Sequence, residues 1–370
     1  MNTNNLIAYD TNLLDNRAIV DNAEQWHRHG NIDDEKLSEI RANFPDKLYT
    51  PNWAVKIGLA IFGSILFSAS SGFLGLFAFE LTERLGGAFL GFMIGIGGFV
   101  VLEMIVIRDK HHYQSGLDNI FLYASLVAVL LGIWQIFDDA PLEVYCFMTA
   151  IACLIATVRY LDSLTAVTGL LALLWGFASL INRIAGDNAA LILPFSGMLF
   201  ALATYFLVKK GRRNPANRFY ALPFDLLEAV SLLIFYAAGN FFVIKTGAVE
   251  IFHFEKVPAP YFFWAFTMAI PILMIVFGLK RKDRILLDIG LFLVAISIAT
   301  FRNFYSVMPV GQAASMAGTL LLGIAWASIR YLKKDDRVFT FAPDGGPTAL
   351  QVLQRVVVNQ AETQQQGNPF

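Results

Sequence analysis

The chain has 370 residues, of which 56% are hydrophobic and only 15% are charged, and its net charge is −1. Soluble domains carry about a quarter charged residues, so this composition, with its charges gathered between long apolar runs, excludes an ordinary soluble protein. The near-neutral balance also excludes a basic nucleic-acid-binding protein. We therefore expect an all-α, polytopic integral membrane protein that contacts a lipid bilayer.

Residues 1–50 are polar, and they predict a short helical hairpin. An apolar stripe with helical spacing ends at Trp26, and Gly30 breaks it. Asp33 or Asp34 then caps a second helix. Two short helices bury little apolar surface, so we expect the hairpin to dock on the membrane domain or on a protein partner. In the second case Trp26 would contact the partner.

Ten later stretches are long and apolar enough to cross a membrane. They are residues 53–78, 86–107, 117–137, 141–160, 163–182, 189–208, 220–244, 259–279, 285–305 and 309–331. The number depends on two joints, at Arg159–Asp162 and near Pro309, because a re-entrant loop at either leaves eight or nine spans. We predict a transmembrane domain over 51–334 and a polar, largely disordered tail over 335–370.

The basic residues predict the orientation of these spans. With the N-terminus inside, only five of the 28 Lys and Arg residues fall on external segments, which leaves 23 on cytoplasmic ones. The five are Arg84, Arg183, Lys245, Lys256 and Arg302. This bias places both termini and the hairpin in the cytoplasm.

A short sequence in the first half of the membrane domain recurs in the second. Ile155 to Arg159 reads Ile-Ala-Thr-Val-Arg, and Ile298 to Arg302 reads Ile-Ala-Thr-Phe-Arg. Each copy ends the fourth span of a five-span half, 53–182 or 189–331. An odd number of spans inverts the second half, as in many secondary transporters. A match of five residues between apolar spans also arises by chance.

Small residues recur every four positions in the first two spans. Gly87, Gly91 and Gly95 do so in the second span, and Ser64 and Ser68 do so in the first. This spacing lets helix backbones approach closely in lipid. We expect packing within the chain, and the alternative is a contact between copies in a homo-oligomer.

Four acidic residues lie inside apolar runs: Glu103, Asp225, Glu228 and Asp288. A charge in the membrane is costly, so each is a candidate for solute, proton or cation binding. Asp225 and Glu228 lie one turn apart and are best placed to share a cation or proton. The alternative is solvation or pairing near the cytoplasmic surface, since Asp288 follows Arg284 by four residues.

Three further polar residues belong to this candidate substrate or ion site. Arg159 and Arg302 end apolar helices, where they can extend to the headgroups, pair with an acid of a neighbouring span or bind an anion. Asn240 can bond across helices, as structural glue or as a ligand.

Patterns for catalysis, metals and cofactors are absent from the sequence. The histidines lack cysteine or carboxylate neighbours at metal-ligand spacing. The sequence has neither a phosphate-binding glycine loop nor a nucleophile elbow. We therefore expect no enzyme, no catalytic residue and no cofactor, and a lipid-modifying membrane enzyme is the least favoured alternative.

Residues 25–40, which run from Gln25-Trp26-His27-Arg28-His29-Gly30 to Leu37-Ser38-Glu39-Ile40, are similar to a recurring bacterial element. Ala299-Thr300-Phe301-Arg302-Asn303-Phe304, followed by a Gly-rich helix with a basic end, extends the likeness. On these residues the chain resembles the predicted membrane protein family called domain of unknown function 2157. The resemblance is best over 20–45 and implies bacterial origin and a multi-span architecture, without an activity.

These observations favour a bacterial inner-membrane transporter or permease-like protein that moves a small solute with a proton or ion gradient. The second hypothesis is a non-catalytic membrane scaffold or sensor subunit. Its hairpin would bind a protein partner while its spans act as an anchor.

Overall fold

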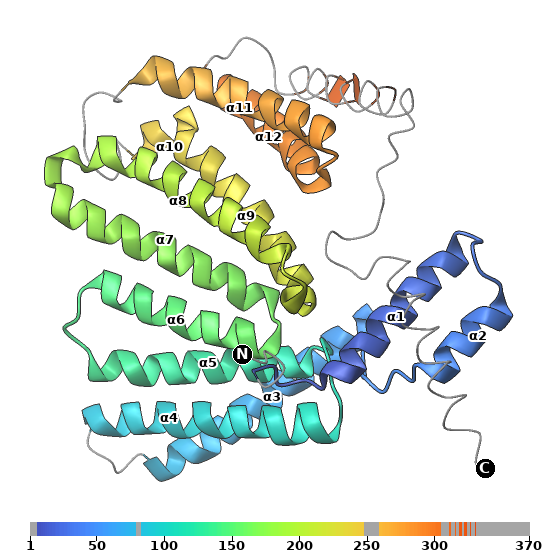
Figure 1. The fold of residues 1–370 in the computed structure, drawn as a ribbon. Helices are drawn as coiled ribbons and strands as arrows, with labels where there is room; N and C mark the ends of the chain where they lie inside the picture. Colours follow the sequence, from blue (N-terminus) through green and yellow to red (C-terminus); the bar gives the residue numbers. More distant parts are fainter. Residues whose placement is uncertain are drawn as a thin grey trace, which may run out of the picture. The chain divides into compact units, whose positions relative to one another are not determined.

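The computed structural model describes residues 6–78, 83–247 and 259–304, with eight single positions between 311 and 330. Over this part of the chain the regular elements are helices (Figure 1). They are α1 (Thr11–Arg28), α2 (Asp34–Asn43), α3 (Trp53–Ala78), α4 (Glu83–Val101), η2 (Leu102–Asp109), α5 (Leu117–Ile136), α6 (Leu142–Tyr160), α7 (Ser163–Ala185), η3 (Gly186–Asn188), α8 (Ala189–Arg212), η4 (Pro215–Tyr220), α9 (Ala221–Gly239), α10 (Phe241–Thr246), α11 (Pro260–Arg281) and α12 (Arg284–Phe304).

Nine helices of the described residues are long and apolar enough to cross a membrane. The prediction of an all-α polytopic membrane protein is therefore confirmed. The predicted tenth span, 309–331, lies largely outside the described residues, and the tail over 335–370 lies wholly outside them.

The uncertain joint at Arg159–Asp162 is a turn between two full helices. Leu161 ends α6 in the left-handed conformation, with a φ of 56°. The Asp162 carboxylate then accepts a hydrogen bond of 2.7 Å from the Thr165 amide and so caps α7. Residues 141–182 thus form two spans.

The chain divides into two compact units, which we describe separately. Unit 1 holds the described residues within 6–173 and 215–223, and unit 2 holds those within 174–214 and 224–330. Residues 215–223 pack on unit 1, because Arg218 pairs with Asp15 at 2.8 Å and the Tyr220 hydroxyl donates to the Val158 carbonyl at 2.7 Å. The unit boundaries therefore differ from those of the predicted repeat halves.

The N-terminal hairpin forms as its sequence predicts. Gly30 takes a φ of 72° where α1 ends, and the Asp33 side chain accepts from the Lys36 amide at the start of α2. Trp26 is half-buried and packs with Ile40 against the small core of this hairpin. The ring therefore packs within the hairpin, where it is less available for the partner contact that we expected.

The hairpin is docked on the membrane helices of unit 1. Tyr9 and Leu14 lie in one apolar core with residues of η2, α5 and α6. The Ala8 amide donates to the Arg159 carbonyl at 2.8 Å, and the Tyr9 hydroxyl donates to Asp118 at 3.3 Å. We expected the hairpin to dock on the membrane domain or on a protein partner, and the structure shows it docked on the membrane domain.

Helices α4 and α5 lie side by side in unit 1 (Figure 1). A Cβ atom on Gly91 would come within 2.8 Å of the Ala128 carbonyl oxygen, and one on Gly95 within 2.8 Å of the Ser125 carbonyl oxygen. A Cβ on Gly87 would meet the Gln135 side chain. The three predicted glycines therefore lie at a close helix contact within the chain.

Ser64 and Ser68 do not pack against another helix of the described residues, and the alternative of a contact between copies stays a prediction. Both side chains are exposed, and the Ser64 hydroxyl donates to the Ala60 carbonyl of its own helix. Gly63 lies on the buried face of α3 instead, where a Cβ would come within 2.8 Å of the Leu117 side chain. Spacing by four defines a stripe along a helix but does not say which side of the helix its neighbours cover.

We expect His112 to give the contact around Tyr49 a pH dependence. It lies between the spans, with its Nδ1 atom 2.7 Å from the Ser115 hydroxyl and its ring against Tyr49. Burial lowers the pKa of His112, and the Asp118 carboxylate opposes this shift. Because the folded state favours the neutral ring, its stabilising contribution is complete above the ordinary pKa of about 6.5 and falls as the pH drops through that value.

We therefore expect residues 6–50 to become more susceptible to limited proteolysis between about pH 7.5 and pH 5.5. A His112→Gln variant should lose part of this acid sensitivity, and His29→Gln should keep all of it, because His29 is exposed. Equal acid sensitivity in the wild type and His112→Gln would contradict the assignment.

Candidate functional site

The candidate site is a cluster of charged side chains at one end of the unit 2 helices. Helix α8 ends in a basic turn that contains Lys209 and Arg212. Asp225 and Glu228 follow in the first two turns of α9. Asp283 precedes α12 and caps it, since its carboxylate accepts from the Leu286 amide at 3.0 Å. In α8 as in α9, residues three apart place both charges on one helix face.

Glu228 is the centre of this cluster, which we call the charge cluster and define as Lys209, Arg212, Asp225, Glu228 and Asp283. Its Oε1 atom lies 3.1 Å from the Lys209 ammonium, and its Oε2 atom lies 3.3 Å from the Arg212 guanidinium. Lys209 also pairs with Asp283, and Arg212 also pairs with Asp225. Each cation therefore bridges two carboxylates.

Exposure falls from the edge of the charge cluster to its centre. The Asp225 and Lys209 side chains are 32% and 31% exposed, whereas Glu228 is 1% exposed. Asp225 is therefore the most exposed carboxylate of a network that includes the buried Glu228.

The five side chains do not balance in charge. Three carboxylates face two cations, so the cluster carries one surplus negative charge when all five are ionised. An uncompensated charge is costly in an environment of low dielectric constant. One bound proton or monovalent cation would balance the charges of these five side chains.

The two acids predicted to share a proton or cation therefore do lie in one network, together with three residues that the prediction missed. Lys209 and Arg212 were counted only as basic residues that indicate the orientation of the chain. Their spacing of three, matched by that of Asp225 and Glu228, was a usable signal for pairing between consecutive helices. Asp283 is the third missed residue. It lies in the turn between α11 and α12, directly after Lys282, whose φ of 56° marks the end of α11.

Glu103 and Arg159 form a separate pair, inside unit 1. The Arg159 guanidinium binds the carboxylate through two nitrogens, at 2.5 and 2.6 Å, and the Tyr160 hydroxyl donates to it at 2.9 Å. Glu103 lies where α4 gives way to the π-helical turn η2. Of the roles expected for Arg159, the structure shows pairing with an acid of a neighbouring span.

Asn240 interrupts the span predicted over 220–244. Its side-chain Oδ1 atom accepts hydrogen bonds from the backbone amides of Phe242 and Val243, so Asn240 is the N-cap of α10. Its amide nitrogen donates to the hydroxyls of Tyr236 and Thr300, each at 3.1 Å. These bonds occupy the buried side chain, so Asn240 serves as glue between α9, α10 and α12.

Asp288 and Arg302 lie outside the charge cluster. Asp288 is 61% exposed and lies 3.4 Å from Arg284, one turn earlier on α12, as the pairing alternative predicts. Arg302 is half-buried near the end of α12, where its Nε atom has no hydrogen-bond partner among the described residues.

In the described part of the chain, no group of three or more His, Cys, Asp or Glu residues is arranged to hold a metal ion. Comparisons with protein-family models, with curated proteins and with solved structures find no match. The resemblance to domain of unknown function 2157 therefore stays a prediction, and the functional argument rests on the geometry of this chain.

Proposed function

We propose that the protein is a gradient-driven transporter of a small solute in the bacterial inner membrane, with both termini in the cytoplasm. The charge cluster would bind the driving proton or cation. The observation that supports this proposal is the surplus carboxylate around the buried Glu228, which lies between two cations that also hold other acids.

The bridged pairing suggests how binding would change the conformation. A proton on Glu228 weakens its attraction for Lys209 and Arg212, which then pair more strongly with Asp283 and Asp225. These partners lie on α8, on α9 and at the turn between α11 and α12. A change of partners therefore biases the packing of four helix ends, and bistable packing of this kind is the basis of alternating access.

The proposal is tested by reconstitution into liposomes that contain a pH-sensitive dye. Amino acids, sugars, carboxylates and inorganic cations are added outside in turn, and the internal pH is recorded. We expect at least one solute to drive a pH change that Glu228→Gln reduces by about tenfold or more, since this substitution removes the titrating group.

Asp288→Asn is the matched control, because it also neutralises an acid of unit 2 but at an exposed position outside the charge cluster. Its pH change should equal that of the wild type. A solute response that is unchanged in Glu228→Gln, with both variants equally well folded, would remove the charge cluster from the mechanism.

The scaffold or sensor function is a second candidate, and one observation favours it. The hairpin is held firmly on unit 1, while Glu35, Lys36 and Glu39 of α2 are exposed. A docked hairpin with a charged outer face is suited to recognise a protein. The variant Glu35→Lys with Glu39→Lys should then abolish partner capture without affecting the solute response, whereas Trp26→Ala is a poor test because it removes core packing.

A further inference from the structure

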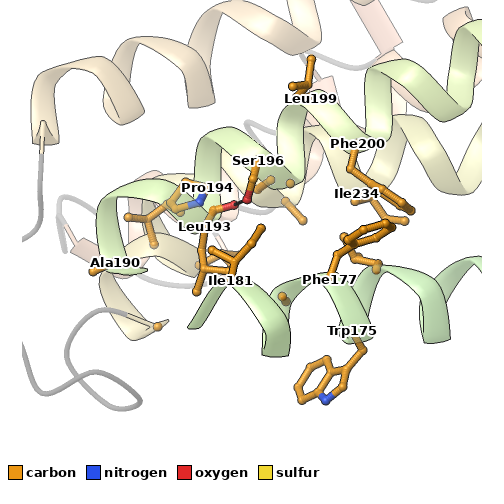
Figure 2. Close-up of a pocket in the computed structure, with 18 of the residues that line it drawn as sticks. Trp175, Phe177, Ile181, Ala190, Leu193, Pro194, Ser196, Leu199, Phe200 and Ile234 are labelled. Carbon is orange, nitrogen blue, oxygen red and sulfur yellow. Dashed lines mark hydrogen bonds between the residues drawn. The ribbon is translucent and has the colours of Figure 1, made fainter. Parts of the chain in front are cut away.

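Unit 2 contains an apolar pocket between helices, and no residue of the charge cluster lines it. It has a volume of about 540 Å³ and is lined by residues of α7, α8, α9 and α10. Figure 2 shows Phe177 of α7 facing Phe200 of α8, with Ile181 and Leu193 further along the same two helices. Volumes of this size hold small organic ligands in other proteins.

The pocket offers a ligand almost no polar group. Among the described residues of the lining, Ser196 is the one that carries a hydroxyl group, and that hydroxyl already donates to the Leu193 carbonyl at 2.9 Å. The lining side chains are otherwise aliphatic or aromatic, with Trp175 at the margin. A sugar, amino acid or ion placed here would lose its hydration without replacement, so the lining selects a hydrocarbon.

The pocket is elongated. The lining runs along α8 from Ala190 to Ala203, which at about 1.5 Å per residue is roughly 20 Å. This length and the volume of about 540 Å³ suit an extended hydrocarbon chain.

The position of the pocket matches one leaflet of a bilayer. Ala190 lies next to the first residue of α8, and Ala203 lies near the middle of that helix. One leaflet contributes about 15 Å of hydrocarbon, so a lining of roughly 20 Å that starts at the helix end reaches slightly past the bilayer midplane. Trp175 and Leu199 of the lining are 63% and 70% exposed, so the pocket opens at the surface of membrane-spanning helices.

We propose that this pocket binds the hydrocarbon chain of a membrane lipid, which enters from one leaflet and lies along α8 between α7 and α9. The proposal does not depend on the transport hypothesis. Lipid tails surround these helices in a bilayer. Their methylene groups can pack against the apolar side chains of Phe177, Phe200 and Ile234, and this packing requires no loss of hydration.

The experiment uses the full chain in lipid nanodiscs that contain a phospholipid with a photoreactive group in the middle of one acyl chain. After illumination, the labelled peptides are identified by mass spectrometry. We expect labelling of pocket residues on α7 and α8 to exceed labelling of the exposed face of α3 by about tenfold, because α3 contributes no residue to the lining of this pocket.

Ala178→Phe and Ala203→Phe each place a phenyl group in the pocket from a different helix, and each should reduce pocket labelling to the level of α3. Ala265→Phe is the matched control, since Ala265 is exposed on α11 and lies outside the lining. Labelling that is equal at the pocket and on α3 would overturn the proposal. So would pocket labelling that persists in both filled variants, provided that they elute as the wild type does from a sizing column.

Discussion

Arg212→Ala is expected to destabilise unit 2 by about 3 kcal/mol, near the lower end of the range for breaking a buried ion pair. Glu228 is 1% exposed and Arg212 is 12% exposed, so water cannot replace the lost guanidinium. The effect should not reach the upper end of that range, because the Lys209 ammonium still lies 3.1 Å from Glu228. Thermal unfolding in detergent, followed by tryptophan fluorescence, measures the change.

Arg284→Ala provides the comparison for this prediction. Arg284 also pairs with an acid, but its side chain and that of Asp288 are 66% and 61% exposed. Exposed pairs contribute about 1 kcal/mol or less, so this variant should unfold close to the wild type. Equal losses in Arg212→Ala and Arg284→Ala would show that burial of Glu228 does not determine the stability of the charge cluster.

A double substitution distinguishes the loss of the Arg212–Glu228 ion pair from the cost of the buried charge that remains on Glu228. If the loss in Arg212→Met comes from removing one of the two cations beside the buried Glu228, then adding Glu228→Gln should recover part of the lost stability. Arg212→Lys should fall between the wild type and Arg212→Ala, because an ammonium keeps the charge but cannot contact Asp225 and Glu228 with a planar fork.

The membrane helices were predictable because a bilayer demands about 20 apolar residues in a row. The turn at Leu161 and Asp162 was predicted with a re-entrant loop as the alternative, because only the charged Arg159 and Asp162 separate the two apolar runs there. The break at Asn240 was not, since its neighbours Gly239 and Phe241 continue an apolar stretch. The Asn240 side chain caps α10 and also bonds Thr300, 60 residues later in the chain, and a local pattern cannot reveal that second contact.

The site was predictable only in its acids. Asp225 and Glu228 stand out because a carboxylate in an apolar run is costly. Lys209 and Arg212 do not, because basic residues at a helix end are common on a cytoplasmic face. Only the packing of α8 against α9 turns these orientation signals into partners of Glu228. The π-helical turn at Glu103 also has no sequence signal that we can identify.

Glycine packing in unit 1 leads to the second large effect, at the contact of α4 with α5. In Gly91→Ala the new methyl group would lie 2.8 Å from the Ala128 carbonyl oxygen and 2.9 Å from the Gly132 Cα atom. These are backbone atoms of α5, so they move only if the helix moves. Overpacking of this kind costs about 1–3 kcal/mol, which exceeds the gain of up to about 1 kcal/mol from replacing glycine in a helix.

Gly97→Ala on the same helix should have the opposite sign. No atom lies within 4 Å of the added Cβ, so only the gain in helix propensity remains and the unfolding temperature should stay the same or rise. Gly132→Ala tests the contact from α5, where the methyl group would lie 2.9 Å from the Ala88 carbonyl oxygen, and it should lower the unfolding temperature as Gly91→Ala does. If Gly97→Ala were as harmful as these two variants, flexibility of α4 would explain its glycines better than close approach to α5. A lower unfolding temperature for Gly91→Ala with an unchanged or higher one for Gly97→Ala would instead show that the stability of unit 1 depends on the close approach of α4 to α5.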